Sequence, residues 1–277
     1  MSTAAIPFAI QPAAQGSAWL RRAFAMFRQY RLQWVLLFCG YLAVLFAVNL
    51  IPAVGPLVVF ALKPVLAVGL LAAAWSQERG GAPAMSQLFH GFRSNVLALL
   101  SIGAFFVLGM ALVIQASAIV DGGKLRDFVA GLTPVTEEQA REAFANTQMQ
   151  LAMLFSAVLA LPVLLATWWA PALVVFHDVG AAKALATSLR ASLANWRALA
   201  TYTVIVFFFY AMLPMMVLTL LALLLPAALM QVLVFLVALP YSIVLTVTLH
   251  ISDYVSYRDV FHPDEALAPL ASGNPAA

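Results

Sequence analysis

Residues 169–196 read WAPALVVFHDVGAAKALATSLRASLANW, and this stretch decides the fold. A hydrophobic run ends at Phe176 and the chain turns over residues 177–180. The residues that follow repeat at spacings of four, four and three, which is one helical face: Leu185, Leu189, Leu193 and Trp196. Three cations flank that face: Lys183, Arg190 and Arg197. The pattern predicts a basic amphipathic helix that lies in a membrane interface before the chain re-enters the bilayer.

The composition excludes an ordinary soluble domain. Hydrophobic residues make up 64% of the 277 residues and charged residues only 9%, whereas about a quarter of the residues of a soluble domain are charged. The single cysteine, Cys39, lies in an apolar run, so we expect neither a disulfide framework nor a cysteine metal site. The segment before Trp19 has no basic start and no apolar core, so we expect no cleavable signal peptide.

Apolar runs of the length of a membrane span, about 20 residues, occur six times. We place them at about 33–51, 57–75, 96–119, 149–176, 198–224 and 228–251. We therefore expect an all-α polytopic membrane protein: six transmembrane helices as three hairpins, each preceded by a cytoplasmic amphipathic interfacial helix. The membrane domain is expected to cover residues 17–262, between disordered tails at 1–16 and 263–277.

The polar loop at 120–148 is expected outside the membrane. It is too short for a separate catalytic domain, and a helix is expected to begin near Glu137 and to run into the fourth span. Ten Lys and Arg residues fall on the opposite side, against three in this loop. Because cytoplasmic loops are enriched in Lys and Arg, both termini are expected in the cytoplasm.

The three helix-plus-hairpin units align as parallel repeats. Phe24, Phe89 and Leu189 take equivalent positions in the three interfacial helices, and six positions later come the equivalent residues Tyr30, Asn95 and Asn195. The second span of each hairpin carries an Ala-Leu-Pro signature at residues 61–64, 160–162 and 238–240, with Lys63 inserted in the first copy. These features favour an internal threefold repeat, as opposed to the inverted repeats of many secondary transporters.

Three patterns resemble a known family. They are residues 169–174 (WAPALV), the spaced set Ala184, Ser188, Ala191 and Asn195, and residues 254–261 (YVSYRDVF). Together they resemble uncharacterised six-span inner-membrane proteins of proteobacteria, which are in turn similar to the membrane domain of some glycerophosphodiester phosphodiesterases. The resemblance covers about residues 17–262 and implies an inner-membrane location and this fold. It implies no activity, because the phosphodiesterase chemistry belongs to a soluble domain that these residues do not contain.

Few groups inside the expected spans can carry chemistry. We expect no Asp or Glu in any span, which argues against a proton-coupled transporter. Lys63 lies ~10 Å into the second span, and it either snorkels to the interface or faces an anionic substrate or headgroup. The other candidates for an intramembrane polar site are Trp168, Trp169 and Tyr241. The two tryptophans suit an aromatic belt or a ligand groove, and Tyr241 suits an interhelical contact.

The histidines offer a weaker case for catalysis. His90, His177, His250 and His262 fall at or beyond the expected cytoplasmic span ends. His177 followed by Asp178 is either an oriented imidazole or an interfacial cap. The sequence carries none of the metalloprotease, hydrolase or phosphate-loop motifs, and we expect no catalytic residue, metal or cofactor.

Seven cations form a predicted cytoplasmic collar: Arg21, Arg22, Arg28, Arg93, Lys183, Arg190 and Arg197. Each would contribute about 1 kcal/mol near an anionic leaflet, or would serve only to set topology. We therefore favour a non-enzymatic inner-membrane protein whose partners are membrane lipids, anionic phospholipid among them, a second copy or another membrane protein, with no nucleic acid. The alternatives are a permease or channel-like protein for a small or apolar molecule, and a lipid enzyme built around His177 and Asp178.

Overall fold

The computed structural model describes residues 5–131 and 136–263, and the elements of this part are helices. Six helical stretches are long and apolar enough to cross a membrane: Arg31–Asn49, Gly55–Glu78, Val96–Asp121, Thr147–His177, Trp196–Leu224 and Ala227–Phe261. Each reaches the range of about 17–25 residues that a span of the hydrocarbon core requires. The predicted class, an all-α polytopic membrane protein, is confirmed.

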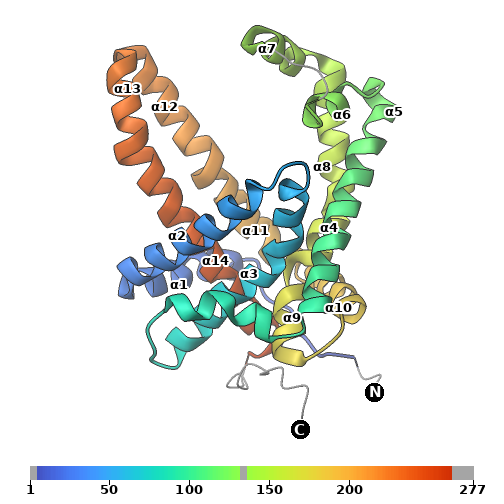
Figure 1. Ribbon diagram of the computed structural model, residues 1–277, viewed down its shortest axis with the longest axis vertical. Helices are drawn as coiled ribbons and strands as arrows, with labels where there is room; N and C mark the ends of the chain where they lie inside the picture. Colours follow the sequence, from blue (N-terminus) through green and yellow to red (C-terminus); the bar gives the residue numbers. More distant parts are fainter. Residues whose placement is uncertain (1–4, 132–135, 264–277) are drawn as a thin grey trace.

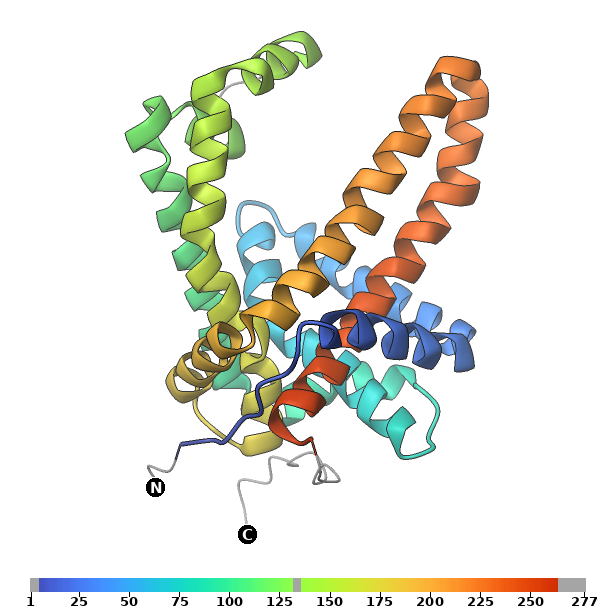
Figure 2. The ribbon, with the colours of Figure 1, turned by 180° about the vertical axis from the view of Figure 1, so that it is seen from behind.

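The spans form three hairpins. The first is α2 (Arg31–Asn49) with α3 (Gly55–Glu78), and the second is α4 (Val96–Ala116) with α8 (Thr147–Trp168), which α9 (Ala170–His177) continues. In the third hairpin each span contains one π-helical interruption. Its first span consists of α11 (Trp196–Phe207), η2 (Phe208–Met212) and α12 (Leu213–Leu224), and its second of α13 (Ala227–Leu233), η3 (Val234–Ala238) and α14 (Leu239–Phe261). The second and third hairpins diverge as two arms from the end where both termini lie, which we call the base (Figure 1, Figure 2).

A short helix precedes each hairpin, as the repeat predicted. These base helices are α1 (Gln15–Gln29), the 3₁₀ helix η1 (Met85–Arg93) and α10 (Ala181–Ala194). The residues that the sequence aligned are structurally equivalent, because Tyr30, Asn95 and Asn195 are the N-caps of α2, α4 and α11. The internal repeat therefore marks the point at which each unit turns from its base helix into its first span.

The base helices pack cyclically. Each one contacts mainly the second span of the preceding hairpin: η1 packs on α3, α10 on α8, and α1 on α14, with α11 beside it. Glycine permits two of these contacts, because a methyl group at Gly91 would lie 1.9 Å from the carbonyl oxygen of Val65, and one at Gly16 would lie 2.2 Å from that of Ala198. The contact of α1 with α14 joins the first unit to the last and closes the ring.

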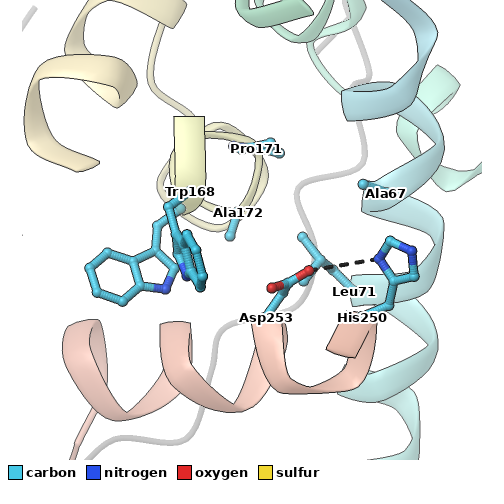
Figure 3. Close-up of a pocket in the computed structure, with 8 residues that line it drawn as sticks. Ala67, Leu71, Trp168, Pro171, Ala172, His250 and Asp253 are labelled. Atoms are coloured by element: carbon cyan, nitrogen blue, oxygen red, sulfur yellow. Dashed lines mark ion pairs between the residues drawn. The ribbon is translucent and has the colours of Figure 1, made fainter. Parts of the chain in front are cut away.

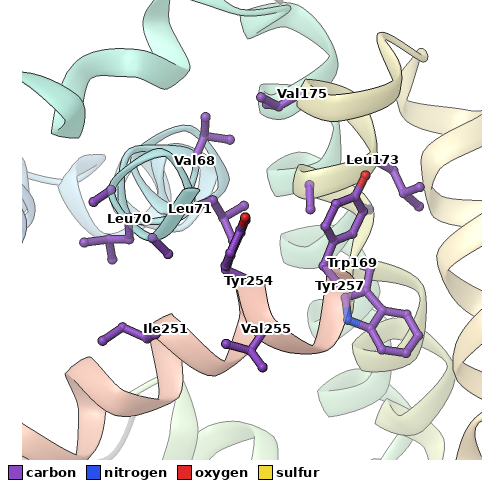
Figure 4. Packing of buried hydrophobic residues seen from close by; sticks show 14 of the residues in the cluster. Val68, Leu70, Leu71, Trp169, Leu173, Val175, Ile251, Tyr254, Val255 and Tyr257 are labelled. Carbon is purple, nitrogen blue, oxygen red and sulfur yellow. The ribbon is translucent and has the colours of Figure 1, made fainter. Parts of the chain in front are cut away.

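The second spans meet at the base and form the core. Figure 4 shows Leu71 of α3, Trp169 and Leu173 at the start of and within α9, and Tyr254 of α14 among the buried side chains between these helices. Trp169, Leu173 and Tyr254 are fully buried, and the indole nitrogen of Trp169 donates to the hydroxyl of Ser256 at 3.0 Å. The base halves of α3, α9 and α14 thus contribute to the centre of the core, and buried residues of α1, α2, α4 and α10 belong to the same cluster.

The sixth span is longer than predicted. We ended it at residue 251, but α14 continues to Phe261. Its last turns carry Asp253 and Asp259, so the expectation that no carboxylate lies within a spanning helix is wrong. Hydropathy ends the span early because these residues are polar, but the helix persists because they are packed against the other hairpins and have partners there. Likewise α3 runs past residue 75 and includes Glu78.

The amino-terminal segment also differs from expectation. We predicted disorder for residues 1–16, yet residues 5–14 follow the base in a defined path and α1 begins at Gln15. The amide of Ala9 donates to the carbonyl oxygen of Val260 at 2.7 Å, and the amide of Gln11 donates to the side-chain oxygen of Asn195 at 2.7 Å. These long-range bonds hold the segment in place. Residues 1–4 and 264–277, including most of the predicted carboxyl-terminal tail, lie outside the described residues.

The polar loop contains three short helices: α5 (Ala118–Asp121), α6 (Lys124–Val129) and α7 (Glu137–Ala145). A helix does begin at Glu137, but it does not run into the fourth span. Asn146 separates the two helices, and its side-chain oxygen accepts from the amides of Gln148 and Met149 and so caps α8. Asparagine is a favoured N-cap because it satisfies amides that lack a partner within the helix.

A serine hydroxyl replaces one backbone hydrogen bond between α8 and α9. In a continuous helix the amide of Trp169 would donate to the carbonyl oxygen of Leu165. Instead the amide donates to the hydroxyl of Ser188 at 3.0 Å, and that hydroxyl donates to Leu165 at 2.9 Å. A side chain inserted in this way is a recognised cause of a sharp bend. Ser188 therefore both docks α10 and bends the fourth span at Trp169, two residues before Pro171.

Replacement of Ser188 tests this arrangement. Ser188→Ala leaves the buried Trp169 amide without its acceptor, and an unsatisfied buried group costs about 1–3 kcal/mol. Ser192 also donates to Leu165, at 3.1 Å, but receives no bond from Trp169. We expect Ser188→Ala to lower the unfolding temperature in detergent clearly more than Ser192→Ala does. Equal losses would show that the inserted hydroxyl has no special role.

Candidate functional site

The base helix α10 has three faces with different tasks. Its buried face packs on α8 through small residues, Ala184, Ser188, Ala191 and Ser192, and the buried Asn195 that follows it bonds to Ala9 and Gln11. Four of these form the spaced set that carried the family resemblance. The resemblance therefore marks a close helix contact, in which small side chains let two backbones approach.

The predicted apolar face of α10 lies beside the buried face and points outward. Leu193 is 55% exposed, and Trp196, the first residue of α11, is 60% exposed. Arg190 is exposed on the next face of α10, and the exposed guanidinium of Arg197, at the start of α11, lies 5.5 Å from the centre of the Trp196 ring. A helix at a membrane interface needs this order, with protein on one side, apolar groups toward the acyl chains and cations at the headgroups.

The other base helices share the same features. In α1 the buried face contains Trp19, Ala23 and Phe27, and Phe24 on the neighbouring face is 45% exposed. Arg21 and Arg28 follow on the next face and are exposed. Because 100° separates successive residues of a helix, the buried, apolar and basic faces of α1 follow each other in the same rotational order as in α10. In η1, exposed aromatics stand beside an exposed cation: Phe89, Phe92 and Arg93.

Arg22 differs from the other cations of the predicted collar. Its guanidinium forms an ion pair with Asp259, whose carboxylate also accepts from the indole nitrogen of Trp19 at 2.9 Å and from the amide of Gln15. Arg22 therefore fastens α1 to α14 and is not free for a headgroup. Of the remaining six cations, Lys183 is partly buried and the others are exposed: Arg21, Arg28, Arg93, Arg190 and Arg197.

A second charged pair joins α3 to α14. Glu78 forms an ion pair with Arg258 and accepts a hydrogen bond from the hydroxyl of Tyr254. These three residues and Arg22 line a hollow of about 430 Å³ between α1, α3 and α14. Each arginine of the hollow is matched by a carboxylate, so the hollow is polar without being an obvious anion site.

The four residues predicted as an intramembrane polar site do not converge. Lys63 is exposed, with its ammonium 4.6 Å from the centre of the Phe60 ring, one turn toward the end of the helix away from the base. Tyr241 donates its hydroxyl to the carbonyl oxygen of Phe209 at 2.6 Å. That carbonyl lacks a helical partner, because Leu213 donates to Phe208 and the next residue is a proline. Tyr241 thus supplies a donor to a carbonyl group that the π-helical turn after α11 leaves without one.

Trp168, in contrast, lies in a group that the sequence did not suggest. It lines a cavity of about 40 Å³ with His250 and Asp253 of α14 (Figure 3). The Nδ1 atom of His250 lies 3.7 Å from the Oδ2 atom of Asp253. The signal available in the sequence was the spacing of three residues, which places a pair on one helical face. The sequence analysis did not pair them, because it ended the span at residue 251 and so left Asp253 in the polar tail.

The histidines of the base do not assemble a catalytic group in the described part of the chain. The ring of His177 stacks on that of His262 at 5.0 Å, while Asp178 is exposed at a turn with φ of 49°. Burial, with a smaller effect of Arg93, lowers the pKa of His90. Within residues 5–131 and 136–263, no three metal-ligating side chains come together.

One comparison with known proteins is informative. The chain is 34% identical over 263 residues to a probable inner membrane protein of Burkholderia thailandensis, covering 92% of this chain and 93% of that protein. No family model matches the chain. No solved structure matches it either.

A substitution at Lys63 tests whether this residue has a buried role. Since its ammonium is exposed, Lys63→Leu should change the free energy of unfolding by no more than about 0.5 kcal/mol and leave membrane insertion intact. Trp169→Phe, which removes the buried bond to Ser256, is the matched comparison and should lower the unfolding temperature. If Lys63→Leu destabilises the protein as much as Trp169→Phe, the exposed placement of Lys63 is wrong.

Proposed function

Since this chain belongs to the family of that Burkholderia thailandensis inner membrane protein, we propose that it is a non-enzymatic integral protein of the inner membrane that binds anionic phospholipid. The base helices supply the binding surface. Their exposed cations would meet phosphate groups, and their exposed aromatic and leucine side chains would enter the acyl region.

The observation that carries the proposal is the three-faced form of α10. A helix that served only to set topology would need cations but no exposed apolar face beside them. Leu193 is exposed near the end of α10, and Trp196 is exposed at the start of α11 beside Arg197. Tryptophan beside arginine at a helix end is a combination suited to the headgroup region, where an amphipathic ring and a cation are both solvated favourably.

The orientation is part of the same proposal. Ten Lys and Arg residues lie in the segments at the base and three in the loop at the opposite end, so the positive-inside rule puts the base and both termini in the cytoplasm. The cytoplasmic leaflet attracts basic segments because of its anionic lipids. Orientation and lipid binding therefore support each other.

Protein partners and an evolutionary link extend the proposal. A second copy or another membrane protein could cover the apolar groove of about 240 Å³ between α12 and α14, which Leu213, Val217 and Tyr241 help to line. The likeness to the membrane domain of some glycerophosphodiester phosphodiesterases rests on the short patterns at residues 169–174 and 254–261. It concerns architecture and adds no activity.

Lipid retention tests the proposal directly. In the double variant Arg190→Gln, Arg197→Gln, two contacts of about 1 kcal/mol each are lost, so less phosphatidylglycerol should remain bound after purification in mild detergent. Mass spectrometry of the complex measures bound lipid per chain. Lys124→Gln removes an exposed cation at the far end and is the matched control. Equal lipid content in the double variant and the wild type would refute the proposal.

Reporter fusions test the orientation. A fluorescent protein fused after residue 277 should fold and fluoresce, because it would remain in the cytoplasm. Alkaline phosphatase, which needs an oxidising compartment, should be active when inserted after residue 130 and inactive after residue 277. The reverse pattern would place the base outside and remove the electrostatic argument for lipid binding.

A further inference from the structure

The cavity beside Trp168 lies where all three hairpins meet. Its walls come from α3 through Ala67 and Leu71, from the bend of the fourth span through Trp168 and Pro171, and from α14 through His250 and Asp253 (Figure 3). Leu71 precedes Glu78, at the base end of α3, by seven residues, which corresponds to ~10 Å along the helix. The cavity is therefore inside the membrane domain, near its base.

Asp253 is the charged group of this cavity. Its side chain is 42% exposed and that of His250 is 24% exposed, and both face the cavity (Figure 3). In the described chain its ion-pair partner is His250. The other ionisable groups near it are Tyr41 on α2 and Tyr202 on α11, while Ala67, Leu71, Trp168 and Pro171 contribute no ionisable group from α3, α8 and α9. The carboxylate therefore lacks the strong cationic partner that Asp259 has in Arg22.

The cavity can hold water. A water molecule needs ~10–15 Å³ by this kind of measure, so a cavity of about 40 Å³ has room for roughly three. The indole nitrogen of Trp168, which is buried, has no hydrogen-bond acceptor within the described residues. Buried polar groups are nearly always hydrogen-bonded, and water between this donor and the Asp253 carboxylate would satisfy both.

We propose that Asp253 and His250 form a proton-binding site of the membrane domain, supplied by water in this cavity. The carboxylate of Asp253 takes up one proton from cavity water and becomes a neutral carboxyl group, and its ion pair with the protonated His250 ends. Release returns this proton to water, and the ion pair forms again. Ionisable groups inside membrane domains commonly mark proton pathways.

The position of the site gives protonation a structural consequence. The outer part of the third hairpin is barely packed against the rest of the protein, since no residue in the most apolar stretch of Trp196–Leu224 is buried. Its base ends, in α11 and α14, attach it to the rest of the protein, and Asp253 lies on α14 between α3 and the bend of the fourth span. A change of charge there alters the contact through which this hairpin is held to the other two. The inference is independent of lipid binding by the base helices.

Infrared difference spectroscopy of the full-length protein in nanodiscs tests the site. On acidification, the carbonyl stretch of a protonated carboxyl group should appear, and Asp253→Asn should abolish one such component. Asp178→Asn is the matched control, because Asp178 is exposed and asparagine tolerates its positive φ. In His250→Gln the carboxylate loses its cationic partner, so proton uptake should occur at a pH higher by about one unit or more.

Two results would overturn the proposal. One is a carboxyl spectrum that is the same in Asp253→Asn and wild type at every pH. The other is a His250→Gln variant that takes up the proton at the wild-type pH, because the pair would then not act as a unit. If Asp253→Asn fails to fold, His250→Gln and Trp168→Phe still decide: the latter keeps the carboxylate but removes the indole donor, and it should also shift the pH of uptake.

Discussion

The closing contact of the ring is the carboxylate of Asp259. It lies near the end of the chain, yet it binds Gln15, Trp19 and Arg22 of the first base helix. The other two base helices follow the hairpins on which they pack, so chain connectivity already keeps them close. The first base helix packs on the last hairpin, which lies more than 200 residues further along the chain. A buried carboxylate with several donors supplies the attachment that connectivity cannot, and the loss of such a partner is strongly unfavourable.

The need for specific attachments also explains why polar residues accumulate at the base. In a bilayer the hydrophobic effect does not drive helices together, so close packing of small residues and hydrogen bonds must do so. Gly16, Gly91 and Ala184 let the three base helices approach their hairpins. Ser188 and Ser256 then bond to the bend at Trp169. The arms carry few such contacts, which is why they diverge while the base remains a single packed body.

Sequence reasoning recovered the parts of this design that depend on local chemistry. Apolar runs revealed six spans, and the alignment of the three units found the caps Tyr30, Asn95 and Asn195. It failed at α14, where hydropathy falls after residue 251 but the helix continues to Phe261. Whether Asp259 is a solvated tail residue or a buried anchor depends on Arg22, more than 200 positions away, and no local pattern contains that information. The same holds for Glu78 with Tyr254 and Arg258.

The two carboxylates of α14, Asp253 and Asp259, differ in role because their surroundings differ. Asp259 is surrounded by an arginine, an indole and an amide, and each of these donors favours the charged form, so this residue holds the fold together in that form. Asp253, six positions earlier, has an imidazole and a small cavity. An imidazole is itself ionisable near neutral pH, so this pair can share, gain or lose a proton. Two carboxylates in different surroundings can therefore take separate roles. The position of Asp253 between the hairpins, and not its residue type, makes it the functional candidate of the two.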